Sequence, residues 1–390
     1  RFWKKASSRP LMRSRRLNEL SMRSRRKNFD VLVAGGGLVG ISISLGLRLR
    51  GLDVLVLDGC DDDNRAARGN FGLIWVQTKG HTFRPYAQLS RKAAKIWPAF
   101  SSQLKELSGI DVGLEGDGAF YLCMSEAEWK DRAELMRKQF DNDLPVAAAY
   151  EMMERGELDK HIPGLGNSVV GGCYGRLDSA VNPLKFFRAL HSAFGVIGGE
   201  YRASSAVTEI RPAGSDFQVT AGNSTYSCAK LVLAAGLGNN RLAPMVDIAM
   251  DVRPVRGQVL ATNKLPKSLH YPTHTVRQMS EGAFIIGDSR EEVGLDDGTT
   301  PEVMSAIARK AIACFPVLAD AQLLRAWGGL RTFTKDGIPL YLRSNSYPNA
   351  YAVNVHSGVT LAPVHAQDLA SAIEEGKLEA RFPDFSRKRS

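Results

Sequence analysis

The feature that most constrains the fold is the stretch at residues 29–58, which reads FDVLVAGGGLVGISISLGLRLRGLDVLVLD. It contains an apolar run, then Gly35, Gly37 and Gly40 in the spacing G-x-G-x-x-G, and then a Leu-rich segment with helical spacing. Gly51 follows that segment, where a glycine commonly ends a helix, and a second apolar run comes next. This order predicts a strand, a tight turn, a helix and a second strand, which together form one βαβ unit.

Each of these glycines has a physical role if the turn binds a dinucleotide. Gly35 allows the tight turn, Gly37 lets a pyrophosphate approach the backbone, and Gly40 lets the helix lie close to the strand. The free N–H groups of the helix N-terminus attract phosphate. Asp58, 18 residues beyond Gly40, is spaced to accept hydrogen bonds from ribose hydroxyls. An acid there argues against NADP and leaves FAD and NAD open, with a purely structural turn as the alternative.

The net charge of +10 belongs to one segment of the chain. Residues 1–28 hold 11 Lys and Arg against a single acid, Glu19, and the remainder holds 40 basic and 40 acidic residues. The body therefore shows no overall bias toward nucleic acid or an anionic membrane. The basic, Ser-rich segment is interpreted as a tail outside the fold, with an organelle presequence or a docking arm for an acidic partner as alternatives.

Cysteine usage and hydropathy narrow the class further. The five cysteines are far apart and form no C-x-x-C pair, so the sequence predicts no metal or iron–sulfur site and no disulfide framework. They are Cys60, Cys123, Cys173, Cys228 and Cys314. No apolar run approaches the roughly 20 residues of a membrane span. A cytoplasmic location is expected, or an organelle if the tail is a presequence.

The two ends of the body read as alternating strands and helices, whereas the middle reads as antiparallel strands. Residues 231–235 and 350–354 are expected as buried strands and residues 359–374 as the last helix. Residues 250–262 and 273–287 are expected as an antiparallel pair. The predicted fold class is therefore α/β, with a discontinuous Rossmann-like dinucleotide-binding domain and an inserted α+β domain containing an antiparallel sheet.

These patterns also predict domain boundaries and two local features. After the tail, the dinucleotide-binding domain comprises residues 29–85, 150–237 and 322–390, and the substrate domain comprises residues 86–149 and 238–321. We expect a helix at residues 88–110 that is interrupted at Pro98. We also expect a short helix at residues 150–155.

Five separate pieces of the chain together resemble a known family. They are VLVAGGGLVG, VLAAGLGNN at 232–240, PVRGQ at 254–258, WGGLRTFTKDGIP at 327–339 and HSGVTLAP at 356–363. In this order they resemble the D-amino-acid oxidase-type FAD-dependent oxidoreductases, which include glycine oxidase, over residues 29–377. The stretch RGNFGLIWVQTKG at 68–80 resembles most the FAD-carrying B subunits of opine (octopine and nopaline) oxidases or dehydrogenases, and also the hydrogen cyanide synthase C subunit.

The resemblance implies FAD rather than NAD, and oxidation of a C–N bond by hydride transfer to flavin N5. The product would be an imine, which water hydrolyses, and the flavin would carry the difficult chemistry. The substrate would be an amino acid or an N-substituted amino acid, such as an opine, a D-amino acid or a secondary amine.

The resemblance also implies which residues bind FAD. Those beside the pyrophosphate, ribose, ribityl chain or adenine would be Gly35, Gly37, Gly40, Asp58, Arg68, Gly69, Asn70, Val207, Ala235 and Gly236. Those near the isoalloxazine ring would be Gly72, Leu73, Gly358, Val359, Thr360 and Leu361. The last four would begin the final helix, whose N-terminus would stabilise negative charge at flavin N1–C2=O.

Two residues are candidates for the reaction itself. Arg331 matches an arginine that binds the substrate carboxylate in several members, a task that suits a planar, permanently charged guanidinium. A salt bridge to Asp336 is the alternative, and Thr332 stands where the family often has proline. His356 matches a histidine near the flavin and would orient cofactor or substrate, with a structural hydrogen bond as the alternative. Weaker pocket candidates are Trp75, His270, Tyr271, His274 and Arg277.

The resemblance bears on the mode of flavin attachment and on partners as well. Covalently flavinylated members use a cysteine before T-K-D-G, and residues 330–334 contain none, so non-covalent FAD is expected. If the chain is the FAD-carrying member of such an assembly, it would need partner subunits with other redox centres. The alternatives to amine oxidation are a flavin monooxygenase of the aromatic-hydroxylase type and a non-enzymatic flavoprotein assembly factor. Neither the particular amine nor the electron acceptor follows from the sequence.

Overall fold

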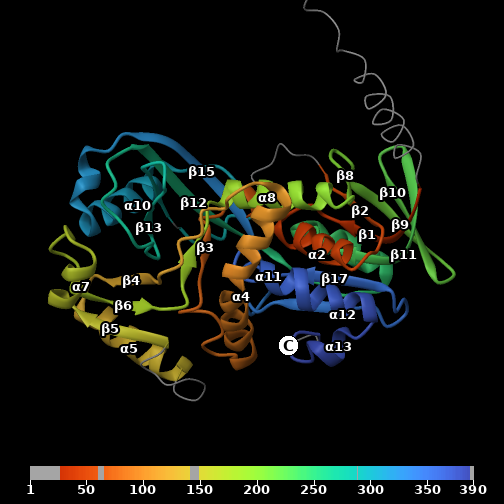
Figure 1. Cartoon of the computed structure of the whole chain (residues 1–390), viewed down its shortest axis with the longest axis horizontal. Coiled ribbons are helices and arrows are strands. Elements are labelled where there is room, and N and C mark those ends of the chain that lie inside the picture. The colour runs from red at the N-terminus through yellow and green to blue at the C-terminus, as the bar shows by residue number, and fades with distance from the viewer. Residues whose placement is uncertain (1–26, 60–65, 141–148, 288, 387–390) are drawn as a thin grey trace, which may run out of the picture.

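The computed structural model of the chain describes residues 27–59, 66–140, 149–287 and 289–386. The predictions for the basic tail at residues 1–26 and for Cys60 lie outside these ranges. Within them the protein comprises one large, mostly parallel sheet and three smaller antiparallel sheets. Figure 1 shows the large sheet with its helices on one side of the molecule and the smaller sheets on the other, with α4 (Arg84–Ser108) between them.

The large sheet contains the N-terminal βαβ unit. Its order is β16-β17-β11-β1-β2-β8, and β10 and β9 continue from β11 as an antiparallel extension. Strand β1 is parallel to both β2 and β11, and β11 is parallel to β17. The strands are β1 (Asn28–Ala34), β2 (Val54–Leu57), β8 (Glu200–Arg202), β9 (Val207–Ala213), β10 (Asp216–Ala221), β11 (Ser224–Leu233), β16 (Leu340–Arg343) and β17 (Ala350–Asn354). The predicted α/β class is confirmed, and strands from both ends of the body share this sheet.

Both faces of the large sheet are covered, as a parallel sheet requires. On one face, Val31 and Val33 of β1 pack in a core with α2 (Leu38–Leu49), α8 (Pro183–Val196) and the C-terminal helical segment. That segment is continuous through α11 (Ala362–Val364), the π-turn η4 (His365–Leu369) and α12 (Ala370–Glu375). On the other face, Leu32 packs with α9 (Asn239–Leu242) and η2 (Ala243–Val246).

Helix α4 differs from the sequence-based expectation, because it continues through Pro98 without interruption. Trp97 and Phe100 are buried beside this proline, and the Trp97 ring lies 4.9 Å from that of Phe186 in α8. Packing of these aromatic side chains compensates for the one helical hydrogen bond that proline removes. The predicted interruption is therefore wrong.

The antiparallel sheets come from the middle of the chain. A four-stranded sheet has the order β13-β14-β12-β15, a three-stranded sheet has the order β4-β6-β5, and β3 pairs with β7. The strands are β3 (Leu73–Ile74), β4 (Ala119–Cys123), β5 (Tyr150–Glu154), β6 (Gly171–Gly175), β7 (Ser179–Ala180), β12 (Arg253–Lys264), β13 (Val276–Gln278), β14 (Ala283–Ile286) and β15 (Leu323–Phe333). Remaining helices are α3 (Ala66–Gly69), α5 (Glu126–Phe140), α7 (Arg155–His161), η1 (Gly236–Gly238), α10 (Pro301–Cys314), η3 (Pro316–Asp320) and α13 (Leu378–Arg381).

This strand pairing corrects one local prediction and bears on the domain division. Residues 150–155 were expected to be helical, but Tyr150–Glu154 forms β5, which pairs along its whole length with β6. Long-range pairing outweighs local propensity in so short a segment. The predicted boundaries at residues 150 and 322 fall just before β5 and β15, although these strands pair with β4–β6 and β12. The division into domains remains a prediction. No helix of the described ranges is long and apolar enough to cross a membrane.

Helix α2 and the C-terminal helical segment contact each other at Gly46 without an intervening side chain. A Cβ atom built on Gly46 would lie 1.8 Å from the carbonyl oxygen of Ala366 and 2.7 Å from the Cβ of Ala370. Both distances are far below van der Waals contact, so this helix pair requires glycine. Gly195, in the last turn of α8, would place its Cβ in open space.

We expect Gly46→Ala to destabilise the protein by about 1–3 kcal/mol, because the added methyl group forces the two helices apart. Gly195→Ala is the matched control and should be neutral or stabilising by up to about 1 kcal/mol, the difference in helix propensity. Urea unfolding followed by circular dichroism measures both changes. Equal midpoints for the two variants would contradict the close packing at Gly46.

Candidate functional site

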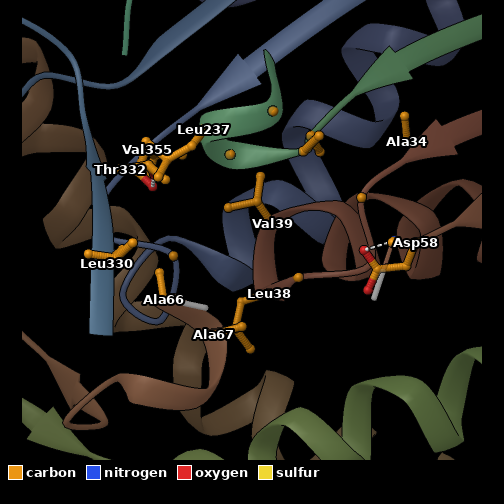
Figure 2. Close-up of a pocket in the computed structure, with 18 of the residues that line it drawn as sticks. Ala34, Leu38, Val39, Asp58, Ala66, Ala67, Leu237, Leu330, Thr332 and Val355 are labelled. Atoms are coloured by element: carbon orange, nitrogen blue, oxygen red, sulfur yellow. Dashed lines mark hydrogen bonds between the residues drawn. The ribbon is translucent and has the colours of Figure 1, made fainter. Parts of the chain in front are cut away.

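A cavity of about 400 Å³ opens where β1, β2 and β11 end. Ala34 and Leu57, the last residues of β1 and β2, and Ala234, which follows β11, all line it. Figure 2 shows Asp58 near one end of this cavity, Leu330 and Thr332 near the other, and Val39 between them. Ligands of open α/β sheets bind at the carboxyl ends of the strands, so this first cavity is where a dinucleotide is expected.

The glycine-rich turn forms the floor of the first cavity. Gly35 has a φ of 108°, and a Cβ there would lie 2.4 Å from the carbonyl oxygen of Ala234. A Cβ on Gly40 would lie 1.9 Å from the carbonyl oxygen of Gly35. Gly37 is different, because its Cβ would approach only the Cβ of Ala67, at 3.9 Å, while the residue lines the cavity. The protein itself requires glycine at 35 and 40, whereas glycine at 37 leaves space for a ligand.

Asp58 is held in a fixed orientation at the end of β2. The residue is only 5% exposed, yet it lines the first cavity. Its Oδ1 accepts a hydrogen bond from the backbone N–H of Gly59 at 3.0 Å (Figure 2). Its Oδ2 accepts one from the hydroxyl of Tyr201, also at 3.0 Å. Tyr201 in turn packs edge-on against His191, whose Nε2 lies 3.0 Å from the carbonyl oxygen of Gly36. Asp58 and the glycine-rich turn are thus linked by side chains that the sequence analysis did not identify.

A second cavity of about 340 Å³ adjoins the first. The two share four lining residues, Ala66, Asn70, His356 and Val359. The second cavity lies between the segment around β3, strands β12 and β15, and the turn after β17. At the junction, Asn70 donates to the carbonyl oxygen of Ala67 at 2.7 Å, while its Oδ1 is buried without a partner among the described residues. An unpartnered buried oxygen is costly, and a ligand that extends through both cavities can satisfy it.

The structure brings most of the sequence-predicted cofactor residues to these two cavities. The first is lined by Gly35, Gly37, Asp58, Asn70, Val207, Ala235, Gly236, Gly358 and Val359. The second is lined by Gly69, Asn70, Gly72, Leu73, Val359 and Thr360. Gly40 and Leu361 line neither, and Leu361 is fully buried in the core. Arg68 lies in α3, and its side chain is outside what the structure describes.

The expected helix N-terminus at residues 358–361 starts later than predicted. These four residues form a turn, and the helix begins at Ala362. The N–H of Leu361 already donates to the carbonyl oxygen of Ser357 at 3.0 Å, so the turn leads directly into the helix. The boundary shift follows from Gly358 and Ser357, which favour a turn over a helical start.

Arg331 lies in β15 and lines the second cavity. Its Nη2 donates to the carbonyl oxygens of Ser289, at 2.6 Å, and Arg256, at 3.2 Å, and its Nε lies 3.4 Å from that of Val255. These contacts fix the plane of the guanidinium against β12. Asp336, the alternative partner that the sequence suggested, accepts from Thr334 and from the N–H of Ile338 within its own turn.

His356 stands at the junction of the two cavities. Its ring stacks on Phe333, with centroids 4.4 Å apart and an interplanar angle of 13°. Its Nε2 lies 2.9 Å from the Nζ of Lys79. Burial, followed by the charges of Lys79, Arg331 and Arg290, lowers the pKa of His356 well below the usual 6.5. The imidazole is therefore neutral near pH 7, and its Nε2 accepts the Lys79 hydrogen bond.

The weaker pocket candidates divide into two groups. Trp75 and His274 line the second cavity, whereas His270, Tyr271 and Arg277 line neither. Arg277 is buried and donates to the carbonyl oxygens of Phe71 and Val181 at 3.2 and 2.7 Å, so it supports the loop before Gly72. Tyr271 packs edge-on against Phe120.

His274 gains importance from a neighbour that the sequence did not reveal. Its ring stacks on Tyr121, with centroids 3.9 Å apart, and both residues line the second cavity. Burial and the nearby charges of Lys310 and Arg132 lower the pKa of His274 well below 6.5. The N–H of Leu122 lies 3.4 Å from Nδ1, and Nε2 is buried without a partner among the described residues. A neutral ring that accepts at Nδ1 carries its proton at Nε2, so His274 offers a hydrogen-bond donor.

The sequence analysis missed Lys79 and Tyr121 as well as His191 and Tyr201. Lys79 lies within RGNFGLIWVQTKG, but nothing in that stretch indicates that its side chain meets a histidine 277 residues away. Tyr121 alternates with buried residues in β4, which is equally typical of an ordinary half-buried strand. Among the described residues there is no group of three or more His, Cys, Asp or Glu side chains that could hold a metal ion.

Comparison with known proteins identifies the family of the chain. A family model described as FAD dependent oxidoreductase matches residues 30–372. The chain belongs to this family. It is 40% identical over 360 residues to the B subunit of opine oxidase from Agrobacterium tumefaciens (strain Ach5), covering 92% of this chain and 97% of the relative.

Two more distant proteins support the same placement. The hydrogen cyanide synthase subunit HcnC of Pseudomonas aeruginosa is 24% identical over 356 residues, covering 80% of this chain and 84% of the relative. The crystal structure of glycine oxidase from Geobacillus kaustophilus superposes with a TM-score of 0.85 at 22% identity, covering 93% of this chain and 99% of that one. The family resemblance read from the sequence is confirmed, as is its implication of FAD rather than NAD.

The first cavity fits the nucleotide part of FAD on structural grounds. Gly37 leaves room against the turn, Asp58 presents a buried carboxylate, and Asn70 presents an unpartnered oxygen at the entrance to the second cavity. We expect Gly37→Val to fold but to bind FAD at least about tenfold more weakly, because its side chain would project into the cavity. Gly116→Val is the control, since a Cβ at Gly116 meets nothing within 4 Å.

Titration of the apoprotein with FAD, followed by quenching of flavin fluorescence, measures this affinity, and a thermal melt of each apoprotein reports its folding. Unchanged FAD affinity in a folded Gly37→Val variant would show that the pyrophosphate does not lie against this turn.

Proposed function

We propose that this protein uses FAD to oxidise the C–N bond of an amino acid or an N-substituted amino acid, such as an opine, a D-amino acid or another secondary amine. The observation that carries the proposal is the 40% identity, over nearly the whole of both chains, to a protein named opine oxidase. The position of Arg331 in a cavity that adjoins the dinucleotide cavity supports it. When bound, FAD supplies the hydride-accepting chemistry, and water hydrolyses the resulting imine of the substrate.

Arg331 is proposed to hold the substrate carboxylate. A guanidinium has five N–H donors, and its carbonyl contacts to β12 and Ser289 fix its orientation. A carboxylate bound there places the adjacent amine within the second cavity. His356, neutral and stacked on Phe333, is proposed to keep the junction between substrate and cofactor in a fixed shape. His274 is proposed to donate a hydrogen bond from Nε2 to the substrate.

We propose that FAD is bound without a covalent link. The described cysteines, Cys123, Cys173, Cys228 and Cys314, are all buried, and none of them lines either cavity. Burial raises the pKa of Cys123 and Cys314 to about 11, so their thiols are protonated and weakly nucleophilic. Precipitation of the holoprotein with acid should therefore release yellow flavin to the supernatant. Flavin that stays with the pellet through repeated washing would mean that the link is covalent.

We also propose that the protein works in an assembly with partner subunits. The relatives from opine oxidase and hydrogen cyanide synthase are each named as one subunit of their enzyme. Such partners would carry other redox centres. A cytoplasmic location is proposed on the free state of the four described cysteines, with an organelle as the alternative if the basic tail is a presequence.

The decisive experiment is anaerobic reduction of the flavin by candidate substrates. The FAD-loaded protein is mixed with D-amino acids, sarcosine, proline and opines, and loss of the oxidised-flavin absorbance is followed before air is readmitted. We expect bleaching by at least one amine that carries a carboxylate, because Arg331 requires one. Bleaching that needs NADPH and no amine would instead indicate a monooxygenase, and bleaching by none of them would favour an assembly factor.

The same experiment with variants at Arg331 tests its role. Arg331→Met should slow flavin reduction at subsaturating substrate by at least about 100-fold, since a charge-assisted pair of hydrogen bonds is lost. Arg331→Lys keeps the charge and should recover part of the rate. Equal rates in the wild type and Arg331→Met would place the carboxylate elsewhere.

A further inference from the structure

Lys79 has no role in the function proposed above, yet it lines the second cavity. It follows β3 in the chain, in the segment before α4. Its backbone is held firmly: its N–H donates to the carbonyl oxygen of Val76 at 3.0 Å, and its carbonyl oxygen accepts from Nε2 of Gln139 at 3.1 Å. Gln139 is itself buried and also donates to Val76, at 2.8 Å. The lysine therefore projects from a fixed base.

The side chain of Lys79 is oriented by His356. The Nζ–Nε2 distance of 2.9 Å requires the ammonium to donate and the imidazole nitrogen to accept. The ring cannot turn away, because it is stacked on Phe333. Donation to a neutral imidazole leaves the positive charge of the ammonium in place. The contact thus holds a cation at the wall of the cavity without neutralising it.

The second cavity has two cationic walls made by different parts of the chain. Arg331 comes from β15 and Lys79 from the segment after β3, and both side chains act electrostatically on His356. The described residues that line this cavity include no Asp or Glu. One carboxylate accounts for Arg331 in the proposed function. A substrate with a single carboxylate gives no reason for the second cation.

We propose that Lys79 binds a second carboxylate of the substrate, which makes the preferred substrate a secondary amine with a carboxylate-bearing carbon on each side of its nitrogen. This inference rests on the proposed function, in which Arg331 holds the first carboxylate. The substrate class is therefore N-carboxyalkyl amino acids rather than simple amino acids. Lys79 acts as a specificity-determining residue, and the oxidised bond is unchanged.

The kinetic test compares two substrates that differ only in the second carboxylate. Iminodiacetate carries two, and N-ethylglycine replaces one of them with a methyl group. Flavin reduction by iminodiacetate should be at least about tenfold less efficient in Lys79→Met than in the wild type, through a weaker apparent affinity, as loss of a charge-assisted hydrogen bond predicts. Reduction by N-ethylglycine should change less than about twofold, and Lys79→Arg should restore iminodiacetate.

Lys92→Met is the matched control, because Lys92 lies on the surface of α4, where it pairs with Asp368, and it lines neither cavity. This variant should leave both substrates unaffected. An equal loss for both substrates in Lys79→Met would overturn the inference, since it would assign Lys79 to the cofactor or to folding.

A binding measurement separates this inference from the proposed function. Isothermal titration of the FAD-loaded protein with glutarate and with butanoate compares two carboxylates with one in compounds that lack an amine. Wild type should prefer glutarate, and Lys79→Met should lose that preference. If no amine reduces the flavin but the glutarate preference is present and depends on Lys79, the proposed function fails and the second anion site stands. If amines reduce the flavin but Lys79→Met keeps the glutarate preference, the proposed function stands and this inference fails.

Discussion

The whole site depends on the backbone contact between the glycine-rich turn and the end of β11. The N–H of Gly35 donates to Leu57 and that of Ala234 donates to Ala34, each at 2.8 Å, so the three strand ends are joined across the turn. The space between Gly35 and Ala234 cannot hold a side chain. This contact sets where α2 begins, and with it the floor of the dinucleotide cavity. Every other wall is positioned against that floor.

The C-terminal end of the chain is positioned in this way. A Cβ on Gly358 would lie 3.5 Å from Val39 and 3.6 Å from Leu38, so the turn after β17 rests directly on the first turn of α2. Thr360, in the same turn, accepts from the N–H of Trp75 at 3.0 Å through its hydroxyl. The two ends of the body and the segment around β3 therefore meet at one place. A dinucleotide site closed by the far end of the sequence follows from these three contacts.

The sequence was sufficient for those parts of the structure whose signal is local. Residues 29–58 form a complete strand, turn and helix pattern, and the structure reproduces it. The short strand β5 was mistaken for a helix, because five residues carry little periodicity and their pairing partner β6 begins 17 residues after β5 ends. The contact between Lys79 and His356 could not be anticipated, since it depends on how a loop and a distant turn meet. Family resemblance supplied Arg331 and His356, but a residue outside the shared motifs leaves no such trace.

The electrostatic character of the second cavity has the same non-local origin. Burial alone would lower the pKa of His356, and the surrounding cations lower it further, so the ring stays an acceptor for Lys79 rather than becoming a third positive charge. His274, on the wall formed with Tyr121, is neutral for the same reasons. The cations stand on separate supports, Arg331 on the pairing of β15 with β12 and Lys79 on the turn that Gln139 fixes. Because neither support belongs to the glycine-rich turn, substitutions at either cation can change which anions bind while the floor of the dinucleotide cavity keeps its shape.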